Sequence, residues 1–325
     1  MQRQAQPSSR KPDQNEAQER IAKRLARAGL CSRREAETWI LAGRVAVNGR
    51  VLDTPAMNVG AEDRIEVDGK PLQARERTRL WLYHKPRGLV TTARDPQGRP
   101  TVFSKLPPEL PRVISVGRLD INSEGLLLLT NDGGLARMLE LPDTGWLRRY
   151  RVRVHGEADP AALARLGEGV AVDGVLYGPI EVTLDRRQGT HTWLTASLRE
   201  GKNREIRNVL GSLGLTVSRL IRTSFGPFQL ADLAEGEVRE IRGRTLRDQL
   251  GARLIARAGA DFDAPLTRQV KKTQAPEPAP SGKSAGLDPS KPGRPRREKN
   301  PLDRLSTRKP ATARKSGRRD ADHRR

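Results

Sequence analysis

Residues 113–134, VISVGRLDINSEGLLLLTNDGG, constrain the fold more than any other stretch of the chain. They open with the apolar run VISV and close with LLLL and the turn residues NDGG, which is typical of two buried strands joined by a polar loop. The loop carries one guanidinium, Arg118, and one carboxylate, Asp120. Rigid strands that hold such a loop are a common way to position reactive groups.

The same residues resemble a known catalytic motif. GRLD at 117–120, followed by SEGLLLLTNDG at 123–133, is similar to the motif of pseudouridine synthases, in the branch that modifies ribosomal RNA and has an S4 domain in front. The resemblance implies that Asp120 is the essential catalytic residue. It also implies that Arg118 fills the space that the target base leaves in its stack.

Composition favours a nucleic acid partner. The 325 residues include 61 Lys and Arg against 39 Asp and Glu, a net charge of +22 at pH 7. An excess of this size argues for a polyanion, whereas a merely solvated basic surface is the weaker alternative. Aromatic residues make up only 3%, so a platform of many stacked rings is not expected.

Cofactor and membrane signals are missing from the sequence. A single cysteine, Cys31, allows no disulfide within the chain, and four scattered histidines do not suggest a zinc site. No Gly-rich dinucleotide fingerprint is present. We find no apolar core of a signal peptide and no apolar run of membrane-spanning length. We therefore expect a soluble, cytoplasmic monomer without a cofactor.

Residues 19–75 form a predicted compact unit. Helical spacing up to Gly29, a capping box from Ser32 to Glu35 and a hairpin turn at 48–49 predict two helices and a hairpin, and a short strand follows. This order resembles the S4 RNA-binding fold. The alternative is an ordinary unit with solvated helices.

Basic side chains cluster on the first two predicted helices and beside the hairpin. Their single sign favours contact with phosphate, which positions RNA but carries little sequence information. The expected RNA contacts are Lys23, Arg24, Arg27, Arg33, Arg34 and Arg44.

A charged linker at 70–80 leads to a strand-rich catalytic domain at 76–258. The predicted fold class is α+β, with an S4-like domain followed by a mostly antiparallel pseudouridine synthase sheet and disordered basic tails. Apolar patterns predict strands at 80–83, 150–154, 170–175, 180–184, 191–198 and 217–221, and helices at 134–141, 158–166 and 246–254.

Two further motifs match the same family in order. HKPRG at 84–88 resembles its first signature, and we expect Lys85 and Arg87 to contact RNA. The alternative is a simple surface turn, which would have the same sequence pattern. Tyr150 takes the place of the active-site tyrosine that lies against the target base. A tyrosine in a strand core is the equal alternative.

The motif EGKNREIR at 200–207 resembles the third signature. There a basic residue pairs with the catalytic carboxylate; Arg207 is the first candidate and Arg204 the second. Burial raises the pKa of a carboxyl group and a nearby guanidinium lowers it, so an ionised catalytic acid needs such a partner. We also expect Lys202 and Arg204 to contact RNA. Without the GRLD motif, we would interpret Arg207 as a solvated helix residue.

The implied reaction isomerises a uridine in ribosomal RNA or a ribosomal subunit precursor. The base leaves ribose through nitrogen, turns and rejoins through carbon, which requires extrusion from its stack. A two-acid glycosidase mechanism is less attractive, because no role can be assigned to Glu124 as a second acid. Large-subunit RNA is the favoured target and small-subunit RNA the alternative.

Two other functions remain open at this stage. One is a non-catalytic S4-type RNA-binding protein in ribosome assembly. The other is an RNA methyltransferase, which would need a Gly-rich nucleotide-binding turn that the sequence does not contain. The segments 1–18 and 259–325 have compositions that cannot bury a core, so we expect both to be disordered and the second to tether RNA.

Overall fold

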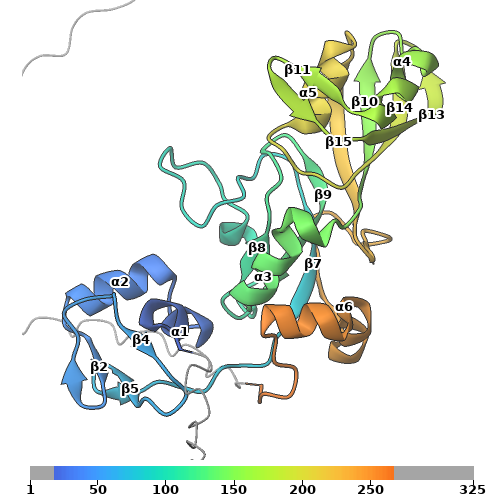
Figure 1. Cartoon of the computed structure of the whole chain (residues 1–325). Helices are drawn as coiled ribbons and strands as arrows, with labels where there is room; N and C mark the ends of the chain where they lie inside the picture. Colours follow the sequence, from blue (N-terminus) through green and yellow to red (C-terminus); the bar gives the residue numbers. More distant parts are fainter. Residues whose placement is uncertain (1–17, 267–325) are drawn as a thin grey trace, which may run out of the picture. The chain divides into compact units, whose positions relative to one another are not determined.

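The computed structural model describes residues 18–266 of the 325-residue chain (Figure 1). The disorder expected for 1–17 and for 267–325 concerns segments outside the described residues. None of the helices in the described part is long and apolar enough to cross a membrane.

The N-terminal unit contains two helices and a small antiparallel sheet in the order β3-β2-β5-β6, and a separate pair of short strands, β1 and β4. Its elements are β1 (Glu19–Arg20), α1 (Ile21–Arg27), α2 (Arg33–Leu41), β2 (Val45–Val47), β3 (Arg50–Val51), β4 (Asn58–Val59), β5 (Ile65–Val67) and β6 (Lys70–Pro71).

Local sequence explains how this unit is built. The predicted capping box is confirmed, because the Ser32 hydroxyl accepts the Glu35 N–H and the Glu35 carboxylate accepts the Ser32 N–H. The predicted hairpin is also confirmed, with left-handed φ values of 52° at Asn48 and 80° at Gly49. One apolar cluster then joins helices and sheet around residues such as Leu25.

The larger domain is organised by a nine-stranded sheet in the order β13-β14-β10-β15-β9-β7-β17, with β16 on β15 and β8 on β9. Its elements are β7 (Leu80–Lys85), η1 (Phe103–Lys105), β8 (Ile114–Val116), β9 (Glu124–Thr130), α3 (Gly133–Glu140), η2 (Pro142–Thr144), β10 (Arg148–His155), α4 (Pro160–Arg165), η3 (Leu166–Glu168), β11 (Val170–Val172), β12 (Val175–Tyr177), β13 (Ile180–Gln188), β14 (His191–Leu198), α5 (Glu205–Ser212), β15 (Thr216–Phe225), β16 (Phe228–Gln229), β17 (Val238–Glu240) and α6 (Gly243–Ala258).

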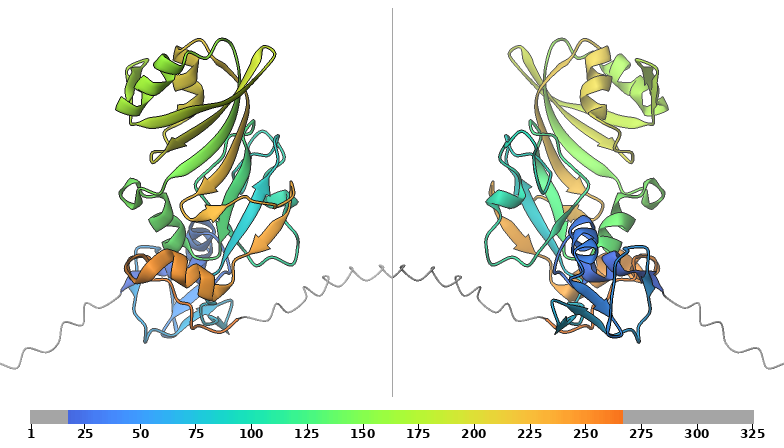
Figure 2. Two further views of the ribbon diagram at one scale, coloured as in Figure 1. Left: turned by 90° about the vertical axis from the view of Figure 1, so that its right-hand side faces the viewer. Right: turned by 90° about the vertical axis from the view of Figure 1, so that its left-hand side faces the viewer.

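Strand β9 is buried on both faces, as the LLLL run predicted. Leu127 and Leu129 belong to one apolar cluster, which we name the first cluster, and to which α4, α5 and the loops before β8 contribute. Leu126 and Leu128 belong to the second cluster, which includes residues of α3 and α6. The sheet thus separates two apolar clusters, one on each side. Figure 2 shows the sheet from two directions.

Strands β9 and β15 pair in parallel, whereas the other pairings of this sheet run antiparallel. The parallel contact is short and places Gly125 directly against Arg222. Gly125 has φ +99°, and a Cβ there would lie 2.7 Å from the Arg222 nitrogen and closer still to its carbonyl oxygen. Only glycine allows the two halves of the sheet to meet this closely.

Several predicted elements differ in extent. The strand expected at 170–175 is a hairpin of β11 and β12, because Asp173 and Gly174 adopt left-handed φ values of 48° and 76°. Strand β15 extends four residues beyond the predicted end at 221. Sequence patterns also missed β17, which is only three residues long.

Residues 259–266, which the sequence assigned to the tail, belong to the described structure. Ala260 and Phe262 pack in the second cluster, and the Thr78 N–H donates to the Asp261 carbonyl at 2.6 Å. A composition argument missed these apolar contacts because they involve only two side chains.

We expect Gly125→Ala to lower the free energy of unfolding by more than about 2 kcal/mol, since it adds both backbone strain and a clash with main-chain atoms. Urea unfolding followed by circular dichroism measures this. The matched control is Gly167→Ala, where no atom lies within 4 Å of the added Cβ and stability should change little. Equal stability of the two variants would contradict the role given to Gly125.

Candidate active site

The loop at 117–123 links β8 to β9 and carries the predicted catalytic carboxylate. Asp120 closes a tight turn, in which the Ser123 N–H donates to the Asp120 carbonyl oxygen at 3.0 Å. Its side chain is 34% exposed. The carboxylate is therefore open to a ligand while its backbone is held.

Lys85 holds this loop in place from the protein interior. Its side chain is completely buried, and its ammonium group donates to the carbonyl oxygens of Pro86 at 2.9 Å, Asp120 at 3.2 Å and Ser123 at 2.9 Å. Burial lowers the pKa of Lys85 to about 8, against the opposing charges of Asp120 and Glu124. The predicted RNA contact of Lys85 is wrong, because a buried ammonium bound to three carbonyls cannot reach RNA.

Two more groups from the segment after β7 fix the same loop. The Thr91 hydroxyl donates to the Leu119 carbonyl at 2.8 Å and accepts the Leu119 N–H at 3.3 Å. The Gly88 N–H donates to the Ile121 carbonyl at 2.7 Å. The first signature therefore orients the loop that carries Asp120, a role that its turn residues alone did not reveal. Sequence reasoning missed Thr91 altogether.

Two arginines approach the loop from the start of α5. Arg204 lies 3.6 Å from the Asp120 carboxylate, with its backbone in the left-handed region at φ 50°. Arg207 instead donates to the carbonyl oxygens of Asn122 at 3.1 Å and Val217 at 2.9 Å. The structure thus reverses the order of the two candidates: Arg204 makes the ion pair, and Arg207 ties the loop to β15.

The surroundings of Asp120 are strongly cationic. Burial lowers the pKa of Arg207, the positive charges of Arg204 and Arg87 lower it further, and Asp120 opposes them. Arg207 therefore has two guanidinium groups and one carboxylate among its charged neighbours. Such an excess of positive charge suits a ligand that brings several negative charges of its own.

Tyr150 and Asp120 belong to the same side of the sheet. Tyr150 packs in the first cluster with Leu119, the neighbour of Asp120, and is 9% exposed. Within residues 18–266, its hydroxyl makes no hydrogen bond, and it is not one of the buried side-chain atoms that lack a partner. Arg118 is exposed.

Glu124 is kept away from Asp120 by the pleat of the strand. It shares the parity of Leu126 and Leu128, which face the second cluster. Its carboxylate is buried and accepts from the Arg219 guanidinium at 2.6 Å and 3.3 Å. Glu124 is thus committed to a structural ion pair.

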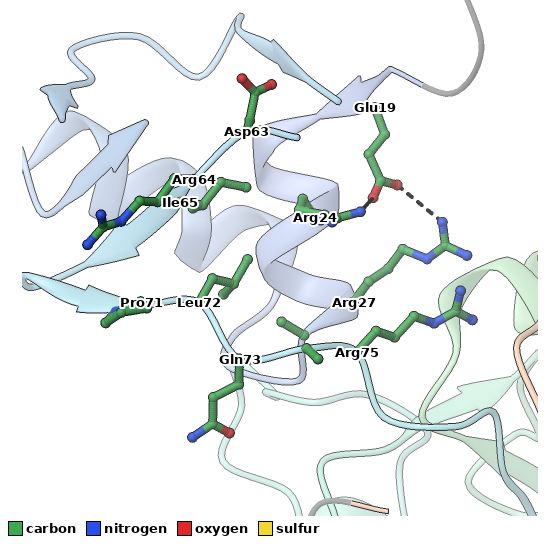
Figure 3. Close-up of a pocket in the computed structure, with 12 residues that line it drawn as sticks. Glu19, Arg24, Arg27, Asp63, Arg64, Ile65, Pro71, Leu72, Gln73 and Arg75 are labelled. Carbon is green, nitrogen blue, oxygen red and sulfur yellow. Dashed lines mark hydrogen bonds and ion pairs between the residues drawn. The ribbon is translucent and has the colours of Figure 1, made fainter. Parts of the chain in front are cut away.

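The arginines of α1 are less free than the sequence suggested. Glu19 lines a pocket of about 250 Å³ in the N-terminal unit and lies 3.6 Å from Arg24 and 3.2 Å from Arg27 (Figure 3). It also lies 3.2 Å from Lys23. Burial raises the pKa of Glu19, but these cations outweigh it and the net shift is downward. One carboxylate therefore offsets part of their charge.

The other predicted RNA contacts divide into paired and open side chains. Arg44 forms a two-point ion pair with Asp68 at 2.6 Å and 2.9 Å. Lys202 donates to Glu200 at 2.6 Å. In the described part of the chain, the exposed side chains of Arg33, Arg34 and Arg87 have no ion pair.

Among residues 18–266, no group of three or more His, Cys, Asp or Glu side chains could hold a metal ion. The chemistry available at the loop consists of one partly exposed carboxylate, guanidinium groups and a tyrosine hydroxyl.

Two family models match the chain. One, described as S4 domain, matches residues 19–65, and one described as RNA pseudouridylate synthase matches residues 79–212. The second range contains Asp120, Tyr150, Arg204 and Arg207.

Full-length relatives agree with these matches. An uncharacterized RNA pseudouridine synthase of Rickettsia bellii is 48% identical over 223 residues, which cover 69% of this chain and 96% of the relative. The ribosomal large subunit pseudouridine synthase B of Pseudomonas aeruginosa is 38% identical over 293 residues, covering 86% and 74%. The protein of the same name from Haemophilus influenzae is 42% identical over 233 residues, covering 70% and 65%.

A crystal structure of a pseudouridylate synthase superposes with a TM-score of 0.51 and 24% identity, over 71% of this chain and 99% of that one. At this identity the likeness concerns the fold.

We expect Lys85→Met to destabilise the protein by on the order of 2 kcal/mol at pH 7, because it leaves buried carbonyl oxygens without a donor. Between pH 8 and 10.5 the unfolded chain keeps the Lys85 proton and the folded protein loses it. The stability of the wild type relative to the variant should therefore rise with pH across this window, by on the order of 3 kcal/mol.

Urea unfolding at several pH values measures both effects. Lys105→Met, at an exposed lysine, is the matched control and should follow the wild type. A stability difference between wild type and Lys85→Met that stays constant from pH 8 to 10.5 would contradict the assignment.

Proposed function

The chain belongs to the RNA pseudouridylate synthase family, and from this premise we propose that it isomerises a specific uridine of ribosomal RNA to pseudouridine with Asp120 as the catalytic carboxylate. The observation that supports this best is the environment of the Asp120 side chain. Its side chain is partly exposed and 3.6 Å from a guanidinium, on a loop held by buried hydrogen bonds.

The site suits a reaction in which one group must be placed accurately. The glycosidic N1–C1′ bond breaks, the base turns, a C5–C1′ bond forms, and the C5 proton is replaced by one on N1, so no atom is gained or lost. Asp120 would act in its ionised form on the ribose or the base, as nucleophile or general base. Arg204 lies 3.6 Å from this carboxylate and forms an ion pair with it.

Other side chains would handle the substrate around this carboxylate. The target nucleotide must leave its stack, and the exposed Arg118, two residues before Asp120, would occupy the vacated space. Tyr150, on the same side of the sheet, would offer its ring edge and hydroxyl to the extruded base. The cationic surroundings of Arg87, Arg204 and Arg207 would bind the neighbouring phosphates.

Ribosomal RNA is the proposed substrate for two reasons. The relatives from Pseudomonas aeruginosa and Haemophilus influenzae are named for the ribosomal large subunit, and they align over most of this chain. The S4 domain match and the net charge of +22 agree with a large structured RNA. We therefore propose large-subunit RNA first, with small-subunit RNA as the alternative target.

A non-catalytic RNA-binding protein is the second candidate. An inactive relative would have no reason to keep the carboxylate, its guanidinium partner and the buried lysine below the loop together. Their joint presence favours the enzyme.

We expect Asp120→Asn to abolish pseudouridine formation while leaving RNA affinity and stability close to wild type, since the change is isosteric and removes only the charge. The measurement is pseudouridine mapping after incubation with unmodified ribosomal RNA transcripts. Asp143→Asn, at an exposed carboxylate, is the matched control and should remain active. Turnover by a clean Asp120→Asn preparation would refute the assignment.

The two arginines of α5 should respond differently to alanine. Arg204→Ala removes the ion pair, so we expect single-turnover rates to fall at least about tenfold without loss of stability. Arg207→Ala should lower both the rate and the melting temperature, because its bonds to Asn122 and Val217 tie the loop to β15. An unchanged rate in Arg207→Ala would leave Arg204 as the essential partner.

A further inference from the structure

Strand β10 carries two different faces. Tyr150, Val152 and Val154 point into the first cluster, on the side of Asp120. The residues between them, Arg149, Arg151, Arg153 and His155, leave the sheet on the opposite side, and three of these four are exposed. Four of the eight residues of this strand therefore present polar or charged groups away from the catalytic loop.

Neighbouring strands extend this cationic surface. In the antiparallel register, Trp193 of β14 lies opposite Arg153 of β10 and opposite Arg186 of β13. His191 lies opposite His155, with ring centroids 5.4 Å apart. We name the surface formed by Arg149, Arg151, Arg153, His155, Arg186, His191 and Trp193 the outer face.

The outer face has no cover in the described structure. The second cluster, which covers this side of the sheet at β7 and β9, contains no residue of β10, β13 or β14. Helices α4 and α5 pack on the other side, through residues of the first cluster (Figures 1 and 2). An antiparallel sheet with one open side is stable in water, but its open side usually mixes charges of both signs.

Here positive charge dominates. Within residues 18–266, the guanidinium groups of Arg149, Arg151, Arg153 and Arg186 form no ion pair. The acids of β13 nearby are Glu181 and Asp185, and Asp185 accepts from the Thr195 hydroxyl at 3.0 Å. Glu124 of β9 also lies on this side, but Arg219, which lies opposite Arg153, offsets its charge. Four unpaired arginines against two carboxylates leave a net positive surface.

The arrangement is organised as well as charged. The Arg151 guanidinium lies over the Trp193 ring, 4.6 Å from its centroid, and Trp193 is only 9% exposed. Burial lowers the pKa of His191, and Arg153 and His155 lower it further. The positive charge at neutral pH thus comes from arginines, whose planar groups suit phosphate.

We propose that the outer face binds the sugar–phosphate backbone of the RNA substrate at a distance from the target nucleotide. Charge complementarity selects RNA as the occupant, because a second copy of this chain would bring the same positive surface. The proposal adds a binding surface to the proposed function and does not depend on the role of Asp120.

The position of the outer face sets a length requirement. The catalytic loop and the outer face lie on opposite sides of one sheet, so a short hairpin that presents only the target uridine cannot reach both. A longer structured RNA can pass around the sheet edge and contact both sides. Contacts to phosphate should also make affinity depend on salt.

The test compares two double variants in the full-length protein. Arg151→Gln with Arg153→Gln removes two charges from the outer face, and Arg137→Gln with Arg165→Gln removes two from exposed helix positions elsewhere. Fluorescence anisotropy over a range of salt concentrations measures affinity for a short target hairpin and for a ribosomal RNA domain that contains it.

We expect the outer-face variant to bind the long RNA several-fold more weakly than the control variant, and its slope of log Kd against log salt to fall by about 1.5. Affinity and turnover on the short hairpin should match the control variant. Equal Kd and slope for the two variants on long RNA would overturn the proposal. An equal loss of affinity for short and long RNA would overturn it too. An equal loss of affinity for polyglutamate, a polyanion without a sugar–phosphate backbone, would do the same. Absence of turnover in every protein form would instead count against the proposed function.

Discussion

The conformation of the loop that carries Asp120 depends on the buried ammonium group of Lys85. A charge taken out of water costs several kcal/mol unless hydrogen bonds replace its hydration. Here three carbonyl oxygens replace part of that hydration, and two of them belong to Asp120 and Ser123. Any displacement of the loop would remove hydrogen-bond acceptors from this buried charge. The conformation that presents the carboxylate is therefore tied to the stability of the domain core.

The sheet separates two kinds of chemistry by its pleat. Because successive side chains of a strand point to opposite faces, Tyr150 lies in the first cluster while Arg149 and Arg151 lie on the outer face. The same rule turns Glu124 away from Asp120, although the two are only four residues apart. Gly125 makes the arrangement possible, since it lets β9 approach β15 closely enough to join the two halves.

The motifs identified which residues lie near the loop better than they identified which contacts each side chain makes. The loop with Asp120 and the segment with Arg204 and Arg207 come together, as the resemblance to the family implied. Which of the two arginines meets the carboxylate could not be predicted. That choice depends on the left-handed backbone at Arg204 and on carbonyl oxygens of β15 and the loop, and no spacing rule encodes either.

By itself, the sequence determined the order of most strands and helices, the buried strand β9, the capping box of α2, the cationic character and the loop that holds Asp120. These follow from local periodicity, turn chemistry and composition. Only the tertiary structure decided that Lys85 is an internal support instead of an RNA contact and that Glu19 offsets part of the charge of α1. It also decided that four arginines share an uncovered face. Such outcomes depend on which distant segments meet, and long-range contacts leave no pattern in neighbouring residues.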